Sequence, residues 1–94
     1  MPIDFKDINQ RIMARANNII PSILPGGSKK GKEWVCANVH GGAGGSCSIN
    51  METGVWADFS TGDKGGDIIS LYAAQNALNQ AQAATALSEM AGVV

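Results

Sequence analysis

The chain has 94 residues, with seven Lys or Arg against eight Asp or Glu and a formal net charge of −1. This length accommodates one domain with a single core, and the charge balance excludes a strongly basic coat that binds DNA of any sequence. Two cysteines are too few for a secreted disulfide scaffold, and neither a leader nor an apolar run of membrane-spanning length is present, so we expect a reduced, cytoplasmic chain without a membrane anchor.

Apolar residues recur at helical spacing in the N-terminal segment, from Pro2 to Asn18. Asp4 stands where it can cap this helix, and Pro21 is expected to end helical structure soon after Asn18. The apolar residues that follow are expected in the core as a further short helical turn: Ile19, Ile20, Ile23 and Leu24.

A break at residues 25–28 separates this segment from the rest of the chain. Residues 29–33 follow as an expected polar loop, and residues 34–36 are expected to form a short strand. The glycine-rich segment 41–45 is expected to be mobile unless something orders it, because fixing glycine backbone costs the most conformational entropy.

Two alternating segments, 46–49 and 55–59, predict a β-hairpin at the centre of the chain. Gly54 ends their connection and supplies the positive φ that hairpin loops favour. The alternation puts Trp56 and Asp58 on one face of the second strand, and it puts three other side chains on the opposite face: Val55, Ala57 and Phe59.

The C-terminal part is predicted to be helical. After a flexible corner at Gly65–Gly66, Asp67 caps a helix that runs to about Ala77, and a second helix spans residues 80–91 with Gly92 as its stop. The whole chain, 1–94, is therefore predicted to be one α+β domain. Its small antiparallel sheet of about three strands, containing a zinc-ribbon-like hairpin, is packed by N- and C-terminal helices.

Two residues have the spacing of metal ligands. Cys36 and His40 have the spacing of one zinc knuckle, but a structural zinc site needs four ligands. The remaining candidates are Cys47, Asp58, Asp63 and Thr61. Cys47 fits a small buried side chain better than a ligand, and the others are weak ligands, so we expect no metal cofactor. Zinc held by Cys36, His40 and one or two aspartates is the alternative.

Catalysis and nucleotide binding have little support in the sequence. The single histidine has no recognisable nucleophile beside it, and the segment Gly41–Ser46 lacks the lysine and the following helix of a phosphate-binding loop. Lys64 precedes a helix start, but Asp63 and Asp67 would repel a phosphate there. We therefore expect a non-catalytic chain.

Aromatic and cationic side chains near the predicted strands indicate single-stranded nucleic acid as a ligand. Aromatic faces that stack bases, flanked by cations that reach phosphates, are typical of such sites. The candidate residues are Lys29, Lys30, Lys32, Trp34, His40, Trp56 and Lys64. The structural alternative is equally open: both tryptophans can serve as the hydrophobic cover of a small sheet, with lysines that only solvate a loop.

The order of these features resembles the N-terminal zinc-binding domain of bacterial and phage DNA primases of the DnaG type. Residues 36–40 stand at the first knuckle, residues 46–49 resemble the serine-containing strand, residues 55–61 resemble the third strand with the second knuckle, and Gly65–Ser70 matches the helix opening. Asp58 and Thr61 stand where the family carries its last two metal cysteines.

The resemblance implies a degenerate domain in which Asp58, Thr61 and Asp67 form a structural corner in place of the metal. It also implies that packing of Trp34, Trp56 and Phe59 replaces the metal's stabilising effect. The expected function is an accessory role in phage or mobile-element replication, binding single-stranded template DNA beside a primase catalytic domain, helicase or polymerase. The alternative is a protein–protein interaction module of such a complex that has lost DNA binding.

Overall fold

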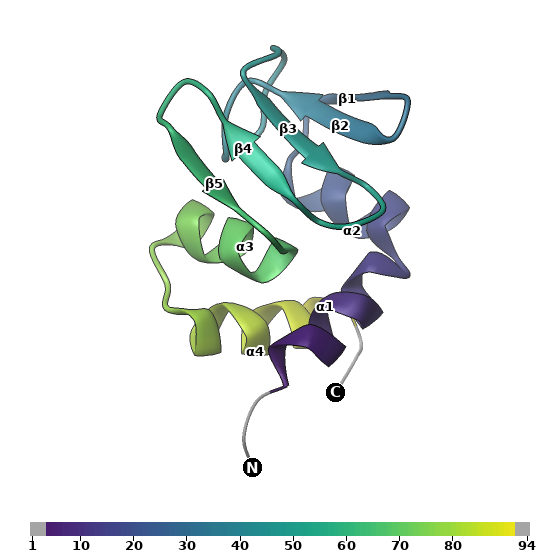
Figure 1. Cartoon of the computed structure of the whole chain (residues 1–94), viewed down its shortest axis with the longest axis vertical. Coiled ribbons are helices and arrows are strands. Elements are labelled where there is room, and N and C mark those ends of the chain that lie inside the picture. The colour runs from purple at the N-terminus through teal and green to yellow at the C-terminus, as the bar shows by residue number, and fades with distance from the viewer. Residues whose placement is uncertain (1–3, 92–94) are drawn as a thin grey trace.

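The computed structural model describes residues 4–91, and in that range it contains four helices and one antiparallel sheet of five strands (Figure 1). Along the chain the elements are α1 (Phe5–Met13), α2 (Ala16–Ile23), β1 (Ser28–Lys30), β2 (Glu33–Cys36), β3 (Cys47–Asn50), β4 (Trp56–Asp58), β5 (Asp63–Gly65), α3 (Ile68–Asn76) and α4 (Gln80–Ala91). The α+β class is confirmed, and the central hairpin is β3–β4.

The sheet has five strands rather than the three expected from the sequence. Each strand pairs with its neighbour along the chain, in the order β1-β2-β3-β4-β5. The two strands that were missed, β1 and β5, are the short edge strands, and the expected polar loop and glycine corner are partly strand. Neither edge strand contains a fully buried residue. Their sequences therefore show no alternation of apolar and polar residues, and only backbone pairing defines them as strands.

The prediction of one continuous helix over residues 2–18 is wrong, because the structure has two helices there, α1 and α2. The chain leaves helical geometry at Arg15, where φ is −119° and ψ is 24°, and α2 then continues through Pro21. Burial of the apolar side chains of α2 outweighs the hydrogen bond that the proline cannot make. Asp4 caps α1 as predicted, accepting from the Asp7 N–H at 3.0 Å, whereas Pro2 lies outside the described residues.

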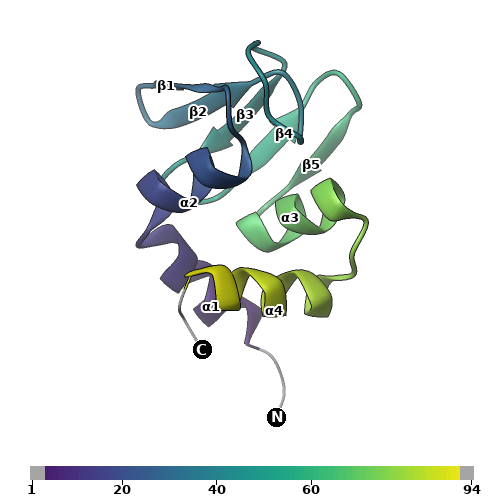
Figure 2. The ribbon, with the colours of Figure 1, turned by 180° about the vertical axis from the view of Figure 1, so that it is seen from behind.

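Helices α2 and α3 lie against one face of the sheet, which we call the inner face (Figure 2). Trp34 on β2, Ile49 on β3 and Trp56 on β4 form one row across this face. The Trp34 indole N–H donates to the Leu24 carbonyl at 3.0 Å, and the Trp56 indole N–H donates to Ser70 Oγ at 3.0 Å. Each tryptophan therefore joins the sheet to the helical layer.

The two C-terminal helices form at the predicted positions. Asp67 caps α3 by accepting from the Ser70 N–H at 2.8 Å, which confirms the predicted cap. Helix α4 buries Ala84 and Leu87 against the rest of the domain and packs on α3 and α1. The predicted stop at Gly92 lies outside the described residues. Within residues 4–91 no helix has both the length and the apolar character needed to cross a membrane.

Candidate nucleic-acid interface

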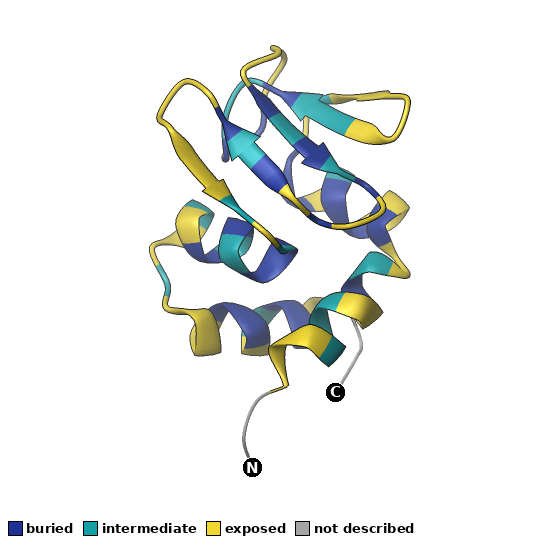
Figure 3. Ribbon diagram, in the orientation of Figure 1, coloured by how far each residue is buried: buried dark blue, intermediate teal, exposed yellow. Residues whose placement is uncertain are grey.

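The two faces of the sheet differ sharply in burial (Figure 3). Pairing places Cys36, Cys47 and Asp58 in one row of the inner face, and all three are buried. The opposite face, which we call the open face, is covered by none of the helices that the structure describes. It carries Ser28, Lys30, Glu33, Val35, Ser48, Asn50, Val55, Ala57, Phe59 and Lys64, all of them half-buried or exposed.

Phe59 is the aromatic residue of the open face. Its side chain is 78% exposed, and Val55 two alternations earlier is 53% exposed. The Phe59 N–H donates to the Ser46 carbonyl at 2.7 Å, which anchors its backbone next to β3. Singly exposed apolar side chains are common on protein surfaces, so what distinguishes Phe59 is its position at the end of β4 on the side of the sheet that the helices leave uncovered.

The tryptophans lie on the inner face instead. Trp56 is only 3% exposed, and Trp34 is half-buried with its N–H bonded to α2. Stacking needs an accessible aromatic face, so a base cannot stack on Trp56 in this structure. Ile49 separates the two indoles, so they do not pair directly, and Phe59 lies on the other side of the sheet. The expected cluster of Trp34, Trp56 and Phe59 is therefore not formed.

The four candidate lysines occupy both edges of the sheet. Lys29 and Lys30 lie on edge strand β1, Lys32 lies in the turn to β2, and Lys64 lies on the opposite edge strand β5. Strand spacings of about 4.8 Å put these edges roughly 19 Å apart. Lys30 and Lys64 belong to the open face. The register places Lys30 in the row of Val55 and Lys64 opposite Ala57, so Lys64 is the lysine nearer to Phe59.

Lys32 forms an ion pair with Glu52, which lies in the turn between β3 and β4. The Lys32 Nζ lies 3.7 Å from Glu52 Oε2, and both side chains are mostly exposed. Exposed ion pairs of this kind contribute little and are weakened by salt. Glu52 nevertheless offsets the positive charge of this turn, and Glu33, the register partner of Lys30, lies beside that lysine in the same way.

Asp58 joins two segments at the end of β4. The carboxylate is 1% exposed and accepts from the Val39 N–H at 3.2 Å, from the Ser60 N–H at 2.9 Å and from the Ser60 hydroxyl. Burial alone raises the pKa of Asp58, but the hydrogen bonds from Ser60 and Val39 outweigh it and leave the pKa below its ordinary value. The carboxylate thereby fixes the loop after β2 to the turn between β4 and β5.

The other two residues of the expected corner lie elsewhere. Thr61 Oγ1 accepts from the Asp63 N–H at 3.2 Å and donates to Asp63 Oδ2 at 3.1 Å, so its side chain stabilises only its own turn. Asp67 caps α3, as described above. Of the three residues, Asp58 is the one whose side chain connects segments distant in the sequence.

Cys36 and His40 differ in burial and in hydrogen bonding. Cys36 is fully buried and its thiol donates to the Asn38 carbonyl at 3.2 Å, whereas His40 is exposed in the turn that follows. Asp58 is already engaged by hydrogen bonds. Among residues 4–91 no three or more His, Cys, Asp or Glu side chains gather where they could hold a metal ion.

The start of the glycine-rich segment is tied to the end of α2. The Gly42 N–H donates to the Pro25 carbonyl at 2.8 Å, and a Cβ at Gly41 would lie 2.6 Å from that same oxygen. Gly41 also has φ of 94°, so only glycine fits this approach. The loop that carries His40 is therefore ordered at its first glycines by backbone contacts, without a ligand.

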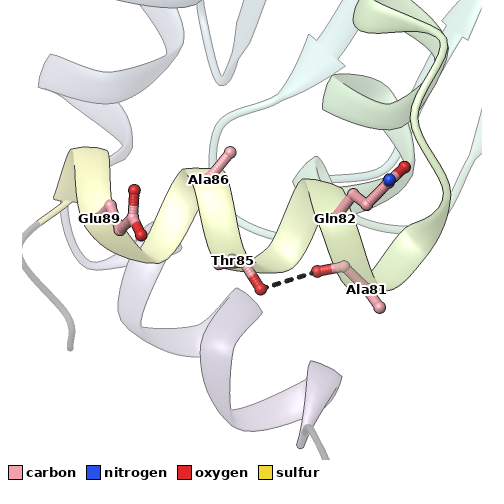
Figure 4. A pocket seen from close by; sticks show the side chains of 5 residues that line it. All are labelled: Ala81, Gln82, Thr85, Ala86 and Glu89. Atoms are coloured by element: carbon pink, nitrogen blue, oxygen red, sulfur yellow. Dashed lines mark hydrogen bonds between the residues drawn. The ribbon is translucent and has the colours of Figure 1, made fainter.

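A second surface feature lies on α4, away from the sheet (Figure 4). A shallow hollow there is lined by Ala81, Gln82, Thr85, Ala86 and Glu89. The Thr85 hydroxyl donates to the Ala81 carbonyl at 3.0 Å within the helix, so its proton is already engaged. The lining is mostly small, which suits contact with another chain better than chemistry.

Sequence reasoning considered Phe59 with the tryptophans as a stacking aromatic residue but did not include it in the final candidate set, although the alternation had already placed it opposite Trp56. The missing information was which face the helices cover.

Comparison of the chain with family models, with curated proteins and with solved structures found no match, so the residues themselves carry the functional argument.

Proposed function

We propose that the chain is a non-catalytic DNA-binding accessory domain that engages single-stranded template DNA during primase- or primase–helicase-driven replication. The open face of the sheet is the contact surface. The observation that carries the proposal is the exposed Phe59 on an uncovered sheet, with Lys30 and Lys64 at its two edges. The primer-forming reaction belongs to a separate catalytic domain.

The chemistry of the open face fits unpaired nucleotides. A base that stacks on an aromatic side chain gains about 1–3 kcal/mol. Lys64 can reach a phosphate near that base, and Lys30 can reach one where the strand has crossed the open face to the row of Val55. Val55 adds exposed apolar surface at the opposite end of β4 from Phe59. Because the chain has a net charge of −1, only a few phosphates are neutralised, and the expected affinity is modest with a shallow salt dependence.

Asp58 supports this surface without touching the ligand. It immediately precedes Phe59, and its bonds to Ser60 reverse the chain directly after the aromatic residue. Phe59 is thereby held at the end of β4 with its ring exposed. In this proposal, Asp58 is a positioning residue, and His40 and Lys29 lie at the periphery of the nucleic-acid contact.

Fluorescence anisotropy with a labelled single-stranded oligonucleotide, repeated over a salt series, tests the proposal. We expect Phe59→Ala to weaken binding about tenfold, the equivalent of about 1.4 kcal/mol, because one stacking contact is lost. The double variant Lys30→Ala/Lys64→Ala is expected to reduce the slope of log affinity against log salt. Phe5→Ala and Lys6→Ala on α1 are the matched controls, and both are expected to bind like the parent protein.

Two results would contradict the proposal. One is a parent protein that shows no salt-dependent binding at low salt, even at millimolar concentration. The other is a Phe59→Ala variant that binds as tightly as the parent. Circular dichroism and unfolding curves of each variant establish that a loss of binding is not a loss of fold.

A second candidate is the protein–protein interaction module of a replication complex. The observation that favours it is the hollow on α4, together with a Met90 side chain that is 47% exposed near the end of that helix. A helix of a helicase or polymerase partner fits such a surface of small side chains. Ala81→Arg would block capture of that partner, with no effect on oligonucleotide binding, whereas Phe59→Ala would have the opposite pattern if the first candidate holds.

A further inference from the structure

Two cysteine side chains lie next to each other on the buried inner face of the sheet. Cys36 on β2 is the direct register partner of Cys47 on β3, and both are free and fully buried. The proposed DNA-binding surface uses neither side chain. They lie on the inner face, next to Asp58, which is the partner of Cys47 on β4.

The hydrogen-bond pattern fixes the spacing of this pair. The Met51 N–H donates to the Lys32 carbonyl at 2.7 Å, which marks these two residues as a hydrogen-bonded pair at the end of the β2–β3 ladder. Hydrogen-bonded and non-bonded pairs alternate in antiparallel strands, so Cys36 and Cys47 are again a hydrogen-bonded pair. The Cα atoms of such a pair lie about 5.5 Å apart, within the range that a disulfide spans. The Cβ atoms of a hydrogen-bonded pair lie about 5 Å or more apart, so the crosslink draws the two strands closer at this point.

We propose that Cys36 and Cys47 form a reversible cross-strand disulfide, a redox modification site whose co-reactant is a small-molecule disulfide such as oxidised glutathione. One cysteine sulfur attacks the small disulfide, forming a mixed disulfide and releasing one small thiol. The second cysteine sulfur attacks the protein sulfur of that adduct and releases the other small thiol. Two protein thiols are oxidised by two electrons, one small disulfide is reduced, and the two protons leave on the two small thiols.

Access to the pair controls when this reaction happens. Burial raises the pKa of both thiols, that of Cys47 to about 12, and only the thiolate attacks a disulfide. The folded sheet therefore protects the reduced pair. Oxidation requires separation of β2 from β3, as happens in the unfolded chain or during a large opening of the sheet.

The crosslink has a defined structural consequence. It would close the loop of residues 37–46 covalently and replace the thiol hydrogen bond from Cys36 to the Asn38 carbonyl. That carbonyl still accepts from the Gly41 N–H at 2.9 Å, so no polar group is left unpaired. The oxidised chain keeps its fold, with the loop and the sheet more resistant to opening.

The test uses the full chain treated with oxidised glutathione, with and without passage through denaturing urea followed by refolding. After refolding, we expect intact mass to show the loss of two hydrogens with no glutathione added, and a non-reducing peptide map to join Cys36 to Cys47. The oxidised protein should melt at least about 5 °C higher than the reduced protein, and dithiothreitol should reverse the shift.

The single variants Cys36→Ala and Cys47→Ala are the controls, and each is expected to stop at a glutathione adduct. In native buffer, the rate of oxidation should rise with urea below the unfolding midpoint. The proposal is overturned if the refolded parent retains two free thiols, stops at the mixed disulfide or forms mainly intermolecular disulfides. Fast oxidation in native buffer without urea would overturn the protective role of the sheet. The peptide map of the parent decides the matter even if a variant does not fold.

Discussion

The inner and open faces of one small sheet show how the same residue types take opposite roles. On the inner face, the indole of Trp56 is buried and its N–H is bonded to Ser70. On the open face, the ring of Phe59, three residues later, is 78% exposed. Aromatic content alone therefore says nothing about ligand binding. Contact with the helical layer separates the aromatic residues that stabilise the fold from the one that is available to a partner.

The largest expected effect on the free energy of unfolding comes from removing the buried aromatic side chain, compared with removing the exposed one. Trp56→Ala is expected to lower the free energy of unfolding by about 3–5 kcal/mol, because it leaves a cavity beneath the sheet. Phe59→Ala is expected to change it by less than about 0.5 kcal/mol, because the ring touches little of the core. Urea unfolding of both variants measures the difference. Similar losses for the two would show that the faces are not distinct.

Asp58 is expected to give the next largest effect. Asp58→Ala should lower the free energy of unfolding by about 2–3 kcal/mol, because the Val39 and Ser60 N–H groups lose a charged acceptor in a buried place. Asp63→Ala is the matched control, since that carboxylate is exposed and bonded only within its turn. If chemical unfolding shows equally small losses of unfolding free energy for both variants, Asp58 does not stabilise the contact between the two segments.

The pH dependence of the same carboxylate gives a smaller, directional effect. Hydrogen bonds lower the pKa of Asp58 in the folded state below the ordinary value of about 3.9. Its contribution to stability is therefore complete above that value and is lost as the pH falls through the folded-state pKa. The stability difference between the parent and Asp58→Asn should be constant at neutral pH and shrink below about pH 4. A difference that grows in acid would contradict this assignment.

The sequence predicted the elements that carry a local signal. Asp4 and Asp67 precede apolar helical runs and form caps, and the alternation of residues 55–59 gives the correct division between faces. These features depend on neighbours within a few positions. The α+β class follows from them.

The sequence could not predict what depends on distant partners. Aromatic side chains lie on both sides of the chain at Trp56 and Phe59, and only the register of β4 with Cys47 and Ile49 shows which side is buried. Similarly, the Trp34 indole finds its acceptor in the Leu24 carbonyl, which no local pattern indicates. The strands β1 and β5 were missed because their side chains are polar and their order comes from backbone pairing.

The charges on the outermost strands have a consequence for the assembly of the chain. An uncapped edge exposes free N–H and C=O groups that invite another strand, and lysines on such an edge oppose this pairing. The neighbouring Lys29 and Lys30 would meet their own copies if two molecules joined through β1, and Lys64 with Asp63 interrupts β5 in the same manner. The charged residues on both edge strands therefore oppose the edge-to-edge pairing through which an open, partly apolar sheet would grow into a fibre. They leave the face of the sheet available to other molecules.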